Sequence, residues 1–357
     1  MWKRIRVSAP GRLCLFGEHQ DFLGLSVIAL ALDLDITIEA RPGNGALLSV
    51  NLPDLGERDE FSALTAREFR HNRDYLPSVV RVLRREGYEL PGLSATVRGT
   101  IPINSGTASS SALVVAWTAL LMAAASGAPP DPATVACLAH RAEVVEFHEP
   151  GGMMDHYTSA LGGLLHIDCA EPITVERLAA TLDGFVLGDT LVRKQTTATL
   201  LKTRVNVQAA VATLQSEQPG FDLRTTPWEA VADLARRLPD EQLRPLQAQF
   251  VNRDLCQEAR RMLAEENFDA ERLGTMLLEH QRQMREGVEV SHPKLDALIV
   301  AAVGAGALGG KLNGSGGGGA MFAYAPGRQA EVKAAIDAAG GRGFIVSPRA
   351  GVRVEIE

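Results

Sequence analysis

The residues best suited to chemistry lie in four short segments, and the first covers residues 9–24 with the sequence APGRLCLFGEHQDFLG. It supplies four polar side chains: Arg12, Glu18, His19 and Asp21. Apolar neighbours and glycine-containing turns would bring these groups together. Convergent polar groups in an apolar setting suit a small hydroxylated ligand. A solvated surface loop is the alternative interpretation.

The second segment, IPINSGTASSSA at residues 101–112, places a Gly/Ser loop before a long apolar run. If that run is a helix, its free N–H groups and its dipole make an anion site at the loop. Ser109, Ser110 and Ser111 add hydroxyl donors or a Mg²⁺ ligand. The loop is neither a Walker loop nor a GxGxxG motif. An ordinary N-terminus of a core helix is the alternative interpretation.

The third segment, KLNGSGGGGAMF at residues 311–322, has five glycines between Gly314 and Gly319. A glycine inside regular structure costs about 0.5–1 kcal/mol relative to alanine. The cluster therefore predicts a close-approach loop. A flexible linker is the alternative, but apolar strand and helix patterns bracket the cluster, which is unusual for linkers.

The fourth segment, residues 141–168, concentrates ionisable groups in an apolar context. Asp155 follows two glycines and two methionines, so we expect it to be partly buried. A buried aspartate of this kind is a base, a helix cap or an ion-pair partner. His148 and His156 flank Asp155 without the i, i+4 spacing of metal ligands, so they are not expected to bind a metal.

The overall composition excludes several classes of function. The chain has 357 residues, of which 46% are hydrophobic, and this predicts two packed domains. A formal net charge of −7 argues against a nucleic-acid or anionic-membrane surface. The four cysteines form no CxxC pair and indicate buried, reduced thiols. Residues 112–125 are too few to span a bilayer and predict a core helix, so we expect a cytoplasmic protein.

The pattern of apolar residues predicts a mixed α+β protein. Strands are expected at 4–7 and 13–16 around a turn at 9–11, at 35–40 with 46–50 as its partner, and at 93–97 and 163–168. Helices are expected at 76–85, from about 110, and at 132–147. Residues 199–303 are mostly amphipathic helix, with a helix at 329–339 and strands at 321–324, 344–346 and 352–356 after them. We predict an N-terminal domain at 1–180 and a C-terminal domain at 181–357.

Together these segments resemble the three motifs of the GHMP kinases, in the expected order. Residues 9–24 resemble the first motif and, more narrowly, the galactokinase signature. Residues 101–112 resemble the ATP loop, with one extra residue after Gly106, and KLNGSGGGG resembles the third motif. The segment GGMMDHYTSALGGLLHIDC is similar to the galactokinase catalytic segment, and the helical residues 252–299 are also galactokinase-like.

The resemblance implies an N-terminal domain like ribosomal protein S5 domain 2, a ferredoxin-like C-terminal domain and an active site in the cleft between them. It implies ATP as co-substrate and Mg²⁺ as cofactor. Asp155 matches the catalytic aspartate and Arg12 its partner, while Ser111 and Glu143 match the Mg²⁺ ligands. The residues matching the sugar contacts are Glu18, His19, Asp21 and Gly152. Those matching the ATP contacts are Gly106, Thr107, Ser109, Ser110, Ser111, Gly314 and Gly316.

The activity implied is ATP-dependent phosphorylation of a sugar hydroxyl, at the anomeric position of galactose or a related monosaccharide. Gln20, Phe22, Leu23 and His156 depart from the usual galactokinase residues, and a sugar-contacting tyrosine expected near Leu201 is absent. The alternatives are a GHMP kinase for another sugar, a sugar acid or a mevalonate-like alcohol, and a catalytically silent sugar sensor. A monomer or homodimer without nucleic-acid or membrane partners is expected.

Overall fold

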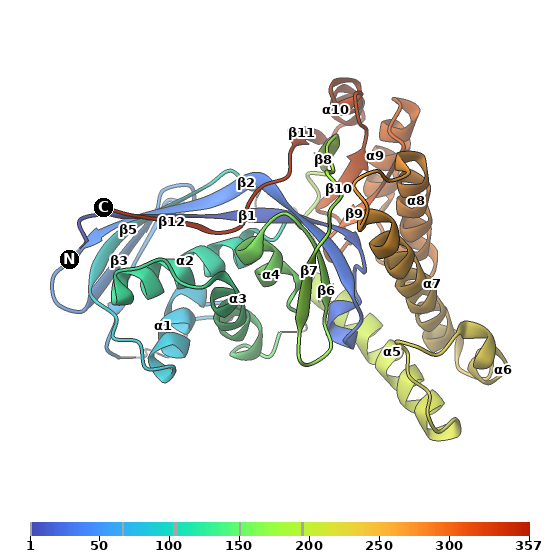
Figure 1. Ribbon diagram of the computed structural model, residues 1–357, viewed down its shortest axis with the longest axis horizontal. Coiled ribbons are helices and arrows are strands. Elements are labelled where there is room, and N and C mark those ends of the chain that lie inside the picture. Colours follow the sequence, from blue (N-terminus) through green and yellow to red (C-terminus); the bar gives the residue numbers. More distant parts are fainter. Residues whose placement is uncertain (1, 66–67, 103–105, 150, 194–195) are drawn as a thin grey trace.

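A computed structural model describes residues 2–65, 68–102, 106–149, 151–193 and 196–357, with the side chains of 196–200 left out of the description. Over these residues the strands form one eight-stranded and one four-stranded sheet. Helices cover one face of the first sheet and gather around the second (Figure 1). The predicted mixed α+β fold with two domains is confirmed.

The first sheet has the order β12-β1-β2-β5-β3-β4, and β6 and β7 extend it from β2. Its strands are β1 (Ile5–Phe16), β2 (Val27–Pro42), β3 (Leu47–Leu52), β4 (Glu57–Ser62), β5 (Leu93–Gly99), β6 (Leu164–Asp168), β7 (Thr174–Arg177) and β12 (Arg353–Ile356). All pairs are antiparallel except β3 with β5.

The turn predicted at residues 9–11 is wrong, because β1 runs through it as one strand. The register with β2 shifts between Pro10 and Arg12, which marks a bulge rather than a reversal of the chain. A Cβ atom at Gly11 would lie 2.7 Å from the carbonyl oxygen of Thr107. The glycine is therefore needed for the close approach of the 107 loop, not for a turn.

The pairing predicted between residues 35–40 and 46–50 is also wrong. β5 occupies the edge of β2, with Ile36 opposite Gly99, and β3 lies parallel to β5 on its far side. β5, which is distant in the sequence, thus takes the place beside β2 that was predicted for the neighbouring strand β3. Alternation of apolar residues does not encode such a non-local pairing.

The helices beside the first sheet are α1 (Tyr75–Arg85), α2 (Ser109–Ser126), α3 (Pro132–His140) and α4 (Met154–Leu161). α2 packs on β1 and β2. It is long and apolar enough to cross a membrane, yet 72% of it is buried inside the protein, which confirms the predicted core helix. The helix predicted at 132–147 ends at His140 and continues as one π-helical turn, η2 (Arg141–Val145).

The second sheet consists of β8 (Phe185–Asp189), β9 (Gly309–Asn313), β10 (Ala320–Tyr324) and β11 (Arg342–Val346), in the antiparallel order β11-β8-β10-β9. Its helices are α5 (Thr196–Glu217), α6 (Ala232–Ala235), α7 (Asp240–Leu263), α8 (Ala270–Glu286), α9 (Pro293–Gly304) and α10 (Gln329–Ala338), and two 3₁₀ turns are η1 (Asp21–Leu23) and η3 (Trp228–Ala230). The order of these elements is the β-α-β-β-α-β order of ferredoxin-like folds, with β8 first, the helices α5 to α9 next, and then β9, β10, α10 and β11.

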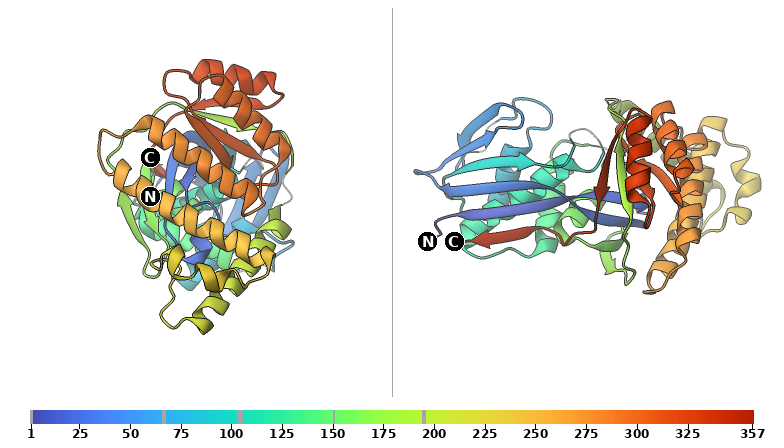
Figure 2. Two further views of the ribbon diagram at one scale, coloured as in Figure 1. Left: turned by 90° about the vertical axis from the view of Figure 1, so that its right-hand side faces the viewer. Right: turned by 90° about the horizontal axis from the view of Figure 1, so that it is seen from above.

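The two sheets share a hydrophobic core. One cluster joins Leu13 and Leu15 of β1 with Phe185 of β8, Phe322 of β10 and Leu273 of α8. The last strand, β12, returns to pair with β1, so the two ends of the chain lie side by side (Figures 1 and 2). The domain boundary near residue 180 falls between β7 and β8 and stays a prediction.

The cysteines match the prediction only in part. All four are free, and Cys14, Cys169 and Cys256 are buried. Cys137 is exposed on α3, so the expectation of a buried thiol is wrong there.

Candidate active site

The centre of the site is an ion pair between Arg12 of β1 and Asp155 in the first turn of α4. Arg12 Nε donates to Asp155 Oδ1 at 2.7 Å, and Arg12 Nη1 donates to the carbonyl oxygen of Gly106 at 2.5 Å. Burial disfavours the charge on Arg12, but Asp155 and Glu18 outweigh it and raise the pKa of the guanidinium above its usual value. Asp155 keeps 27% of its side chain exposed, so it faces both the arginine and the cavity.

The loop before α2 lies against this pair. The backbone N–H of Arg12 donates to Thr107 O at 3.2 Å, and Ala108 at the N-cap has a φ of 61°. The N-cap residue Ala108 makes no side-chain hydrogen bond to the first turn of α2, and this end of the helix carries the positive end of its dipole. A helix N-terminus preceded by this loop is the arrangement that can bind an anion, and anion binding here stays a prediction.

A carboxylate from the π-helical turn reaches the same helix end. Glu143 is buried, and its Oε2 lies 2.8 Å from Nε2 of His156. Burial raises the pKa of Glu143, but hydrogen bonds from His156, Ser110 and Ser111 together hold it below its usual value. The structure thus brings Glu143 and Ser111 together, as the sequence predicted for two ligands of one ion.

The loop after β1 carries the predicted sugar contacts. His19 has a φ of 63°, and Asp21 Oδ1 accepts a hydrogen bond from the N–H of Phe22 at 2.9 Å. A Cβ atom at Gly152 would lie 2.1 Å from the Asp21 carboxylate, so a larger residue there would have to displace that side chain. Burial, together with the nearby charge of Asp155, raises the pKa of Asp21 to about 6.

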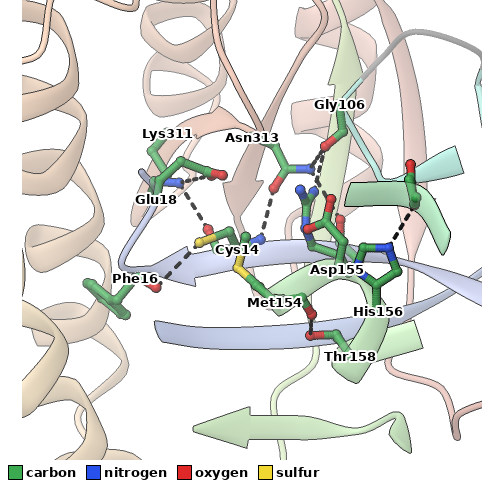
Figure 3. Close-up of polar contacts among 12 residues, drawn as sticks. Cys14, Phe16, Glu18, Gly106, Met154, Asp155, His156, Thr158, Lys311 and Asn313 are labelled. Carbon is green, nitrogen blue, oxygen red and sulfur yellow. Dashed lines mark hydrogen bonds and ion pairs between the residues drawn. The ribbon is translucent and has the colours of Figure 1, made fainter. Parts of the chain in front are cut away.

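Two residues of β9, Lys311 and Asn313, complete the site and were not predicted. The fully buried Lys311 Nζ donates to Glu18 Oε2 at 3.0 Å and to Cys14 O at 2.9 Å. Burial raises the pKa of Glu18, but Lys311 and Arg12 outweigh it and lower the value. Figure 3 shows Lys311 and Asn313 reaching from β9 toward β1.

Asn313 connects β1 to the loop before α2. Its Oδ1 accepts from the N–H of Cys14 at 2.9 Å, and its Nδ2 donates to Arg12 O at 3.2 Å and Gly106 O at 3.0 Å (Figure 3). The one signal in the sequence was position, because Lys311 and Asn313 directly precede the glycine cluster. Nothing in the spacing revealed that their partners lie between 207 and 301 positions away in the chain.

The glycine cluster packs closely, as predicted, but mostly against protein backbone. A Cβ atom at Gly314 would lie 2.7 Å from Gly106 O, and one at Gly316 would lie 2.1 Å from Val290 O. Gly314 therefore seats the third motif against the loop before α2. Gly316 instead fixes the cluster to the segment after α8.

These groups surround a cavity of about 200 Å³. The predicted residues that line it are Arg12, Glu18, His19, Asp21, Ser110, Ser111, Glu143, Gly152, Asp155 and Gly314. The predicted residues Gly106, Thr107, Ser109 and Gly316 lie outside this lining, and Phe22, Tyr75 and the ion pair of Arg73 with Glu149 belong to it. Leu201 is 52% exposed and is not part of the wall, which Phe22 forms instead.

The described residues contain no group of three His, Cys, Asp or Glu side chains that would hold a metal ion alone. Mg²⁺ in phosphoryl-transfer sites needs fewer protein ligands, because substrate phosphates and water complete its octahedron. The pairing of the Glu143 carboxylate with the Ser111 hydroxyl at the open end of α2 fits such an ion.

Comparisons with known proteins agree with this geometry. The model described as GHMP kinases N terminal domain matches residues 74–163, and GHMP kinases C terminal matches 253–342. The galactokinase galactose-binding signature matches residues 3–42. The chain belongs to the GHMP kinase superfamily, whose members are phosphotransferases with ATP as co-substrate.

Within this superfamily the chain is galactokinase-like. It is 30% identical to a galactokinase of Roseiflexus sp. (strain RS-1), covering 88% of this chain and 81% of that protein. It is also 26% identical to a mevalonate kinase of Thermococcus sibiricus, covering 99% and 98%. Its fold matches a Lactococcus lactis galactokinase complexed with galactose, with a TM-score of 0.85 at 18% identity over 98% and 95% of the two chains.

Proposed function

We propose that the chain transfers the γ-phosphoryl group of ATP to a hydroxyl of a monosaccharide, at the anomeric position of galactose or a related sugar. The observation that carries the proposal is the Arg12–Asp155 pair at the cavity, flanked by the polar loop of β1 on one side and the open end of α2 on the other. A hydroxylated substrate on the first side and a polyphosphate on the second would meet at Asp155.

In this mechanism the substrate oxygen attacks the γ-phosphorus, a new O–P bond forms, and the bond to the β-bridging oxygen breaks to release ADP. Asp155 accepts the proton of the attacking hydroxyl, a role that commonly contributes about 10²–10⁴-fold to a rate. The guanidinium of Arg12 stabilises the negative charge of Asp155 and fixes the carboxylate through the 2.7 Å hydrogen bond. Positioning and electrostatics carry most of phosphoryl-transfer catalysis.

The other side chains bind and orient the two substrates. His19 and Asp21 face the cavity and supply a donor and an acceptor for vicinal hydroxyls, and Glu18 is held beside them by Lys311. Ser110 and the N–H groups at the start of α2 face the phosphates. Ser111 and Glu143 would hold Mg²⁺, which neutralises charge on the phosphate oxygens when bound.

The alternative functions use the same site but differ in the acceptor substrate, or bind a sugar without phosphorylating it. The mevalonate kinases that match the whole chain keep a mevalonate-like alcohol as one candidate, beside other sugars and sugar acids. A silent sugar sensor would not need the Arg12–Asp155 pair to be intact. We place the reaction in the cytoplasm, carried out by a monomer or homodimer.

The test is release of ADP from Mg·ATP in the presence of single acceptors: a panel of aldoses, uronic acids and mevalonate. We expect turnover with at least one monosaccharide and none with mevalonate. Turnover with mevalonate alone would replace the sugar by that alcohol. Saturable sugar binding by calorimetry without any ADP release would identify a sensor.

A further inference from the structure

The imidazole of His156 makes a single polar contact among the described residues, and that contact is with Glu143. His156 is 1% exposed, and its Nε2 lies 2.8 Å from Glu143 Oε2 (Figure 3). A carboxylate only accepts hydrogen bonds, so the ring donates from Nε2. His156 thus lines the cavity and directs its donor at Glu143.

The rest of the ring is held by packing. Its Nδ1 is buried and has no hydrogen-bond partner in the described part of the chain. The ring of His140 meets it edge-on, with centroids 5.3 Å apart. The hydrogen bond from Nε2 to Glu143 is thus the polar contact that holds the ring within the described residues. The ring is therefore fixed in place with one donor directed at one oxygen.

Glu143 needs such a partner because of where it lies. It belongs to the π-helical turn Arg141–Val145, and π-helical turns are often found at functional sites. A glutamate side chain has three rotatable bonds, and the hydrogen bond to Oε2 removes much of that freedom. The same carboxylate meets the hydroxyls of Ser110 and Ser111 at the start of α2.

We infer that His156 is a positioning residue that orients the Glu143 carboxylate for the divalent cation of the nucleotide complex. This inference rests on the proposed function, since it takes Glu143 to be a Mg²⁺ ligand. Groups that orient a metal ligand through a hydrogen bond typically change metal affinity by about 10–100-fold when removed. His156 is the histidine whose ring nitrogen reaches Glu143. His140 packs against the ring of His156 and is not expected to orient Glu143.

The test measures ATP binding by calorimetry, with Mg²⁺ and with EDTA, in the wild type and in His156→Leu and His156→Gln. The Mg²⁺-dependent gain in ATP affinity should fall about 10-fold or more in His156→Leu, because the orienting donor is lost. ATP affinity in EDTA should stay unchanged. His156→Gln should recover most of the gain, because its amide donates at a similar reach.

The matched control is His140→Leu, which removes the packing ring and leaves the bond to Glu143; it should keep the wild-type gain. Should His156→Leu not fold by circular dichroism, His156→Asn gives the same contrast with His156→Gln, because its amide is too short to reach Glu143. The inference on His156 is overturned if His156→Leu and His156→Asn keep the Mg²⁺-dependent gain in ATP affinity, or if His156→Gln does not recover a lost gain. Either result leaves the proposed function standing. A wild type whose ATP affinity ignores Mg²⁺ overturns the metal assignment of the proposed function and the inference with it.

Discussion

At the scale of single residues, Asp155 combines an ion pair with Arg12 and access to the cavity. Its Oδ1 is engaged by Arg12, and a quarter of its side chain stays open to the cavity. An asparagine at 155 would retain an oxygen for Arg12 and lose the ability to take a proton. This separates the chemical role of the residue from its structural one.

We therefore expect Asp155→Asn to lower kcat by at least about 100-fold, the usual size of the loss of a general base. Binding of a fluorescent ATP analogue should persist, because the open end of α2 is untouched. ADP release and nucleotide titration measure the two effects. A variant with wild-type turnover would remove Asp155 from the role of base.

Asp21 gives a prediction about pH. Its pKa is raised from 3.8 to about 6 by burial and by the charge of Asp155. As the pH rises through about 6, Asp21 loses its proton and becomes the stronger acceptor for sugar hydroxyls. We expect kcat/KM for the sugar to rise over this range and Asp21→Asn to lack that limb. An identical acid limb in the variant would assign the titration to another group.

The same shift has an opposite effect on stability. The folded protein holds the Asp21 proton more tightly than the unfolded chain does, so the free energy of unfolding falls as the pH rises from 3.8 to about 6. Asp21 thus favours function and opposes stability near neutral pH, a trade that is common at active sites.

The sequence predicted the residues of the site better than their partners. Arg12, Asp155, Glu143 and Ser111 lie together as their motifs implied. Lys311 was missed, because a lysine is rarely fully buried and its partner Glu18 is 293 positions away. Long-range ion pairs of this kind depend on how β9 meets β1, which no local pattern contains.

At the scale of elements, β9 is fastened to β1 by Lys311 and Asn313. Removing one partner of a buried ion pair leaves the other charge unpaired, which typically costs about 3–5 kcal/mol. We expect Lys311→Met to lower the free energy of unfolding by that amount in urea titrations. The double variant with Glu18→Gln should be more stable than Lys311→Met alone. A Lys311→Met variant as stable as the wild type would contradict the buried pair.

The glycine cluster gives a prediction with a matched control. Gly316 and Gly327 share a φ of 75°, but a Cβ atom would meet Val290 O at 2.1 Å at Gly316 and open space at Gly327. We expect Gly316→Ala to displace the cluster, with Gly314 and the loop before α2, and to weaken ATP binding. Gly327→Ala should introduce the same backbone strain without a clash, and its ATP affinity should equal that of the wild type. Equal ATP affinity in the two variants would separate the cluster from the nucleotide site.

Local sequence patterns predicted most of the helices and strands. They failed where contacts with distant parts of the chain determine the local structure. The helix α1 and the strands β5 and β10 lie where periodicity placed them. The predicted turn at Gly11 failed because the glycine serves a contact with Thr107. The π-helical turn η2 was also not predicted, because such a turn has the composition of an ordinary α-helix.

At the scale of the whole molecule, the two sheets are not independent units. The core cluster spans β1, β8, β10 and α8, and β12 closes the first sheet from the far end of the chain. The site lies where these parts meet, so its shape depends on both. The sequence motifs predicted that these segments belong to one site. How the two halves of the chain pack to bring the segments together could not be predicted from the sequence.

This shared architecture supports a galactokinase-like GHMP kinase without fixing its acceptor substrate. The galactose-binding signature matches residues 3–42, yet Phe22 and Leu23 stand where galactokinases usually have Tyr and Asn. Phe22 lines the cavity, with the guanidinium of Arg204 5.5 Å from its ring centre, and Leu201 lies outside the lining. The wall thus offers an aromatic face where a polar contact to galactose is expected.

We therefore expect galactose to be a weaker substrate than at least one other aldose or uronic acid that differs from it at a ring position. Losing a hydrogen bond to a substrate hydroxyl typically costs about 0.5–1.5 kcal/mol, enough to reorder closely related sugars. The measurement is kcat/KM for each sugar at saturating Mg·ATP, with KM for ATP as the control that the nucleotide side is unchanged. A value for galactose above that of every other aldose and uronic acid tested would contradict the prediction and make galactose the substrate of this site.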